Sequence, residues 1–144
     1  MIYLRTLLLI TLLVSPFISL AETLKSEAEA RQLADRIMAQ AAKGNLSEAF
    51  NLMKPYVIIP EAELQSAALQ SKAQRDQFSN RYGKSIGYEF IAEKRAGTSL
   101  LQLIYIEKTA KHALPWNFYF YKSPSGWVLN SFFWNDQLPS VFPH

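Results

Sequence analysis

The chain has 144 residues, enough for one folded domain, with 15 basic and 12 acidic side chains. It contains no cysteine, which excludes disulfide bonds, thiolate catalysis, cysteine-ligated zinc and the lipidated cysteine of a lipoprotein. The basic residues are scattered along the sequence, whereas nucleic-acid binding needs a concentrated basic surface. We therefore expect no nucleic-acid partner.

The first 21 residues have the pattern of a cleaved signal peptide. Arg5 provides a short basic region, an uncharged apolar run follows, and Ser19-Leu20-Ala21 places small residues before a cleavage site. The alternative is a retained membrane anchor, but the uncharged run contains Pro16 and is shorter than the roughly 20 residues that span a bilayer. An exported chain without disulfides fits a bacterial periplasm. We expect cleavage after Ala21, no anchor thereafter, and a single mature domain of residues 22–144.

Three helices are predicted next. Ser26 to Glu29 forms a capping box that opens the first helix, and Gly44 ends it. A shorter helix opens at Asn45 and stops before Pro55. The apolar positions of the first helix recur at helical spacing: Ala30, Leu33, Ala34, Ile37, Met38 and Ala41.

The third helix is expected over 61–82, with Gly83 as its stop, after a short apolar run, 56–59, that is either a small strand or a plug. Its inward stripe is unusual because polar residues interrupt it. The stripe consists of Leu64, Ala67, Ala68, Ser71, Arg75, Phe78 and Tyr82.

Four strand-like segments follow, at about 86–93, 100–106, 116–121 and 127–134. Short turns join them, which predicts an antiparallel meander covered on one face by the helices, an α+β fold. In the first strand, Ile86 and Tyr88 are expected on one face. The last three strands are apolar on both faces, so the second face is too apolar for water. We expect a homodimer through this face, with Tyr119, Tyr121, Phe132 and Trp134 in the contact.

This order of helices and strands, closed by tryptophans, resembles the nuclear transport factor 2-like superfamily, which includes ketosteroid isomerase and scytalone dehydratase. Three segments also look like small exported bacterial proteins of unknown function: Tyr82 to Phe90, Trp116 to Lys122 and Gly126 to Phe132. The resemblance implies a curved, cone-like sheet with a cavity under the helices, and dimers through the sheet. The catalytic motifs of the superfamily are not matched, so no chemistry is carried over.

The polar side chains expected to line that cavity suggest a binding site. Arg75 would direct its guanidinium at an anionic ligand, while the alternative places it on the surface or pairs it with Asp76, Glu89 or Glu93. A small apolar or anionic ligand is therefore expected. The predicted ligand-binding residues are Ser71, Arg75, Tyr82, Tyr88 and Tyr105.

Other candidates for chemistry have simpler interpretations. His112 falls on a predicted loop and is expected to be solvated, and two histidines without a partner cluster predict no metal site. Glu107 shares its parity with Tyr105, so it can face inward near a rim, and Asp136 can sit at the cavity mouth, but both are mainly solubilising charges. The tryptophans are expected in the core or an interface. No catalytic residue and no cofactor is predicted.

The sequence thus favours a non-enzymatic periplasmic domain, a dimeric small-ligand-binding or accessory module. One alternative is an isomerase-like or dehydratase-like enzyme acting on a small apolar substrate in the cavity. Another is a structural subunit of an envelope assembly.

Overall fold

The computed structural model describes residues 21–142. Apart from Ala21, the predicted signal peptide lies outside the described residues, as does His144. The elements follow in the order α1 (Glu27–Ala42), α2 (Leu46–Met53), α3 (Glu61–Tyr82), β1 (Ser85–Ala96), β2 (Leu100–Thr109), β3 (Ala113–Ser123), β4 (Gly126–Trp134) and the short 3-10 turn η1 (Leu138–Val141). The predicted α+β class is confirmed. Between residues 21 and 142, no helix has the length and apolar character needed to cross a membrane.

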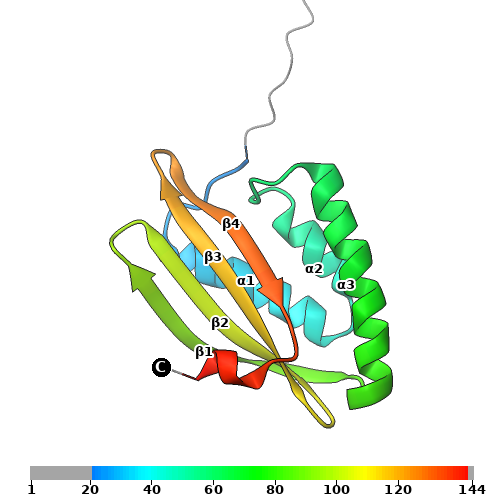
Figure 1. The fold of residues 1–144 in the computed structure, drawn as a ribbon. Coiled ribbons are helices and arrows are strands. Elements are labelled where there is room, and N and C mark those ends of the chain that lie inside the picture. Colours follow the sequence, from blue (N-terminus) through cyan, green and yellow to red (C-terminus); the bar gives the residue numbers. More distant parts are fainter. Residues whose placement is uncertain (1–20, 143–144) are drawn as a thin grey trace, which may run out of the picture.

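The four strands form one antiparallel sheet in chain order, as predicted. The three helices lie on one side of this sheet, and η1 folds against the other (Figure 1). The sheet is not strongly curled, so it lacks the pronounced cone shape that we expected.

Helix α1 is stabilised by capping interactions at its ends and by the burial of its apolar stripe. The Ser26 hydroxyl accepts the N–H of Glu29 at 3.1 Å, and the Glu29 carboxylate accepts the N–H of Lys25 at 2.7 Å, one residue before the position that a capping box uses. Gly44 ends the helix with φ of 81°, a conformation that favours glycine. All six residues of the predicted stripe are buried.

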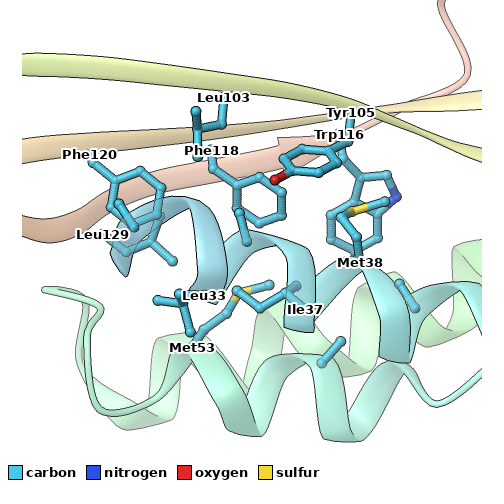
Figure 2. Packing of buried hydrophobic residues seen from close by; sticks show 14 of the residues in the cluster. Leu33, Ile37, Met38, Met53, Leu103, Tyr105, Trp116, Phe118, Phe120 and Leu129 are labelled. Atoms are coloured by element: carbon cyan, nitrogen blue, oxygen red, sulfur yellow. The ribbon is translucent and has the colours of Figure 1, made fainter. Parts of the chain in front are cut away.

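The buried stripe of α1 fills the space over the middle of the sheet (Figure 2). Leu33, Ile37 and Met38 are fully buried there, opposite Trp116 and Phe118 from β3. Burying one such side chain is worth about 1.5–3 kcal/mol. Side chains therefore occupy the place where the predicted cavity would lie.

Helix α3 has the predicted bounds but a much weaker attachment. Of its 22 residues, only Leu64 and Arg75 are buried. Leu69 is exposed on its outer surface. The helix is held mainly by α2 and by a few side chains that reach the sheet.

A bulge in β4 overturns the predicted placement of two aromatic residues. Tyr119 pairs with Ser131 but Phe120 pairs with Leu129, so Asn130 is an extra residue that reverses the alternation after it. Phe132 and Trp134 consequently face the helices: the Phe132 ring packs on that of Phe50, with centroids 5.5 Å apart, and Trp134 is buried. The prediction that they lie on the outer face of the sheet is therefore wrong.

A bulge between Ser85 and Gly87 has a similar effect on β1. Ile86 was predicted to share the half-buried face of Tyr88. It is instead 70% exposed, so this prediction is wrong.

The segment before α1 is tied to the far end of the chain. Leu24 and Trp127 exchange two backbone hydrogen bonds, each of 2.8 Å, and Glu22 donates to the Pro55 carbonyl at 2.7 Å. A Cβ on Gly126 would lie 2.7 Å from the Leu24 carbonyl oxygen, so only glycine lets the two segments come this close. We call the Leu24–Trp127 bridge the N-terminal clasp.

Candidate ligand-binding groove

A buried ion pair joins α3 to the sheet. Arg75 points inward, as predicted, and is 9% exposed. Its Nη2 atom donates to Oε1 of Glu107, which lies on β2 and is completely buried. The partner differs from the three carboxylates considered in the sequence, and Glu107 faces inward rather than acting as a solubilising charge.

The second carboxylate oxygen of Glu107 accepts a hydrogen bond of 3.1 Å from the indole Nε1 of Trp116. Burial raises the pKa of Glu107, and the nearby Arg75 charge, Ser85 and Trp116 oppose this rise. Because both oxygens are occupied, the carboxylate serves as an internal acceptor between α3 and β3.

A second link between α3 and the sheet lies at Ser71. The Ser71 hydroxyl accepts the indole N–H of Trp134 at 3.0 Å. The Trp134 ring stacks on Trp116 with centroids 5.8 Å apart and meets Phe78 edge to face. The Arg75 guanidinium carbon lies 6.0 Å from the Trp134 ring centre, within the range of a cation–π contact. Ser71 and Arg75 thus belong to one cluster.

Tyr82, at the end of α3, closes the same side of the molecule. Its hydroxyl donates to Asp136 at 3.1 Å, and partial burial together with this bond raises the pKa of Tyr82. Its ring stacks on His112, with centroids 4.4 Å apart. His112 also contacts the Asp136 carbonyl through Nε2 at 2.9 Å, so the prediction of a solvated histidine is wrong.

Tyr88 and Tyr105 lie elsewhere, under α1. The Tyr105 hydroxyl donates to Asp35 at 2.7 Å, and burial together with this bond raises the pKa of Tyr105. Tyr88 lies beside it, with ring centroids 6.2 Å apart, and Arg31 lies over the neighbouring Phe90 ring. The structure therefore brings together Ser71 and Arg75, with Tyr82 farther along the same helix, and separates them from Tyr88 and Tyr105.

An open groove of about 630 Å³ lies beside the ion pair, between the start of α2 and the C-terminal half of α3. Its volume is within the roughly 300–1,000 Å³ of small-molecule sites. Arg75 and Ser85 line it; the buried Nη1 atom of Arg75 has no hydrogen-bond partner in the described residues, whereas the Ser85 hydroxyl is near enough to Glu107 to help lower its pKa. Most other lining residues are polar or charged.

Sequence reasoning missed the α2 wall of this groove. Asn45 was interpreted only as the residue that opens the second helix, and Ser47 and Glu48, which also line the groove, were not identified, because a helix start does not indicate the surface that it faces. The buried position of Glu107 could have been predicted from the sequence. Glu107 alternates with the inward-facing residues of β2, and buried tryptophans such as Trp116 need a hydrogen-bond acceptor.

No protein-family model, curated protein or solved structure matches the chain. Within residues 21–142, no three histidine, aspartate or glutamate side chains gather in a way that would hold a metal ion.

Proposed function

We propose that the chain is an exported, non-enzymatic binding module that holds a small ligand in the groove between α2 and α3. The observation that carries this proposal is Arg75, a residue that lines the groove and whose buried Nη1 atom has no hydrogen-bond partner within the described residues. An unsatisfied buried polar group costs about 1–3 kcal/mol, and a ligand that bonds to it recovers part of this cost.

The surroundings of Glu107 support binding rather than catalysis. A general base must reach its substrate with a free oxygen. Glu107 is completely buried, and its two oxygens accept from Arg75 and Trp116. The filled space under α1 also argues for a ligand in the outer groove and against an apolar substrate inside a cone.

Native mass spectrometry of protein purified from a bacterial periplasm tests the proposal. We expect extra mass that is lost on denaturation, and a loss of this mass when Ser79→Trp fills the groove. Ser66→Trp, on an exposed part of α3 that does not line this groove, is the matched control. Bare protein, or a ligand that both variants keep, would refute the groove as the site. N-terminal sequencing of the same sample tests export, with Glu22 expected as the first residue.

The outer face of the sheet supports a second proposal, a homodimer. Without Phe132 and Trp134, the face still carries Tyr119 and Tyr121, and Phe133 stacks on Tyr119 with centroids 6.0 Å apart. Tyr121 and Phe133 are 41% and 44% exposed. Neighbouring aromatic side chains exposed to this extent are typical of a protein–protein interface. Light scattering should give a dimer mass that Tyr121→Lys halves and Leu69→Lys, on the outer surface of α3, leaves unchanged. A monomeric wild type would end this proposal.

The element order also supports a distant relationship to the nuclear transport factor 2-like superfamily. Three helices precede a four-stranded meander, as in the resemblance drawn from the sequence, although strong curl of the sheet is missing.

A further inference from the structure

The first turn of α2 leaves backbone donors free on one wall of the groove. The N–H groups of Leu46, Ser47 and Glu48 have no acceptor among the described residues, and the first helical bond is that from Ala49 to the Asn45 carbonyl, at 3.1 Å. The Asn45 side chain does not cap the helix. Three N–H groups at the positive end of a helix dipole favour an anion.

The opposite wall provides a second, independent observation. Arg75 is nine-tenths buried, one of its terminal nitrogens is used by Glu107, and Nη1 has no partner. A guanidinium binds two oxygens of a carboxylate or phosphate group in a fixed geometry. The Nη1 nitrogen of Arg75 is therefore a buried donor that no described residue uses.

The charges along the groove favour the same ligand class. Four basic and two acidic side chains line it. Lys43 and Lys84 form no ion pair within residues 21–142. The carboxylate of Asp76 lies 3.7 Å from the amine of Lys72, and that of Glu48 accepts the side-chain amide of Asn51 at 3.4 Å. The lining of the groove therefore keeps a net positive charge.

We propose that the groove binds a small oxyanion, a phosphate, sulfate or carboxylate group, between the first turn of α2 and Arg75. This inference rests on the proposed function, because it names the chemical class of the ligand in the same groove. The backbone N–H groups of residues 46–48 bond to the anion, Arg75 Nη1 donates to one oxygen, and Lys43 and Lys84 add unpaired positive charge.

Amide NMR titration of the mature protein with sodium phosphate, sodium sulfate and sodium acetate, at constant ionic strength, tests the proposal directly. At least one of the three should give saturable shifts of the Leu46, Ser47 and Glu48 amide signals at concentrations below about 50 mM. Sodium chloride should not. Amides on the outer sheet face, such as that of Tyr121, provide the internal reference.

Two charge variants sharpen the result without touching the buried ion pair. Lys43→Gln with Lys84→Gln should weaken the binding of that anion about threefold to tenfold. Lys94→Gln with Lys111→Gln removes the same charge from exposed positions outside this groove and should change little. Equal weakening by both pairs would show a general charge effect and overturn the site.

The outcomes separate this inference from the proposed function. If all three anions leave residues 46–48 unchanged while a neutral molecule shifts groove residues, the groove binds a ligand but the anion inference fails. If neither the anions nor any mass retained by the native protein engages the groove, both proposals fail. A retained organic mass that sodium phosphate displaces identifies the source as a phosphorylated or carboxylated molecule, and saturable shifts without such a mass identify the free ion. Either result supports the inference.

Discussion

The helix-facing side of the sheet has two halves that are built differently. Under α1, Leu33, Ile37 and Met38 fill the space against Phe118 and its neighbours. Under α3, Arg75 and Ser71 reach Glu107 and Trp134 through hydrogen bonds. The same sheet surface is thus covered by an apolar contact at one side and by a polar one at the other.

The difference follows from the two helical stripes. Apolar side chains pack in many arrangements until the space is full, whereas a polar contact must satisfy every donor and acceptor at fixed geometry. The α3 contact satisfies Glu107 and Trp134 but leaves Arg75 Nη1 without a partner. The apolar half under α1 stabilises the fold, whereas the polar half under α3 leaves a buried hydrogen-bond donor without a partner in the described part of the chain.

The largest expected effect is on the apolar half of the sheet under α1. Phe118→Ala should lower the free energy of unfolding by about 3–5 kcal/mol, because Phe118 is completely buried. Phe78→Ala, on the half-buried inner side of α3, should cost about half as much or less. Urea unfolding of both variants measures the difference. Equal losses would show that α3 is packed as tightly as α1.

The next effect tests the polar half. Arg75→Met leaves the buried Glu107 without its cation and should cost about 2–4 kcal/mol. Replacing both residues, Arg75→Met with Glu107→Gln, should recover most of this loss, because no buried charge is left unpaired and the amide oxygen still accepts from Trp116. Urea unfolding again provides the measurement. A double variant no more stable than the single one would show that the pair is needed for the fold itself.

The pH dependence of stability distinguishes the two opposing effects on the pKa of Glu107, burial and the nearby Arg75 charge. Burial raises its pKa above 4.5, so the folded chain holds this proton more tightly than the unfolded chain. The resulting stabilisation is complete below the unfolded pKa and is lost as the pH rises through the folded one. Wild-type stability, compared with that of Glu107→Gln, should therefore fall as the pH rises from about 4 to 8. A relative gain over this range would mean that attraction to Arg75 outweighs burial.

The smallest effect concerns the start of α1. Ser26→Ala removes the cap on the Glu29 N–H and should cost about 1 kcal/mol. Ser66→Ala, at an exposed interior position of α3, should be neutral or slightly stabilising, because alanine is the better helix former. Thermal unfolding compares them. A similar loss in both would contradict the capping role of Ser26.

Local rules predicted the parts of the fold that depend on neighbouring residues. Ser26, Gly44 and Gly83 mark helix ends through backbone chemistry, and the α1 stripe follows from helical spacing alone. The bulge at Asn130 was not predicted, because Phe132 and Phe133 are both aromatic and the sequence does not indicate which one faces the helices.

Long-range contacts were predicted less well. Residues 71, 75 and 82 were placed together because they share a helix, but Tyr88 and Tyr105 were assigned to the same cavity only through the expected cone. The groove needs α2 beside α3, a packing that the sequence of neither helix specifies.

The N-terminal clasp has a consequence for the time course of folding. Leu24 precedes every helix and Trp127 lies in the last strand, so this contact closes a loop over most of the described residues. Contacts of such long sequence separation form slowly. The apolar stripe of α1 can be buried only after β2 and β3 have been made, and both strands are synthesised after all three helices. We therefore expect the native packing of α1 on the sheet to form only after the C-terminal quarter of the chain has been made, which would give the proposed export time to begin first.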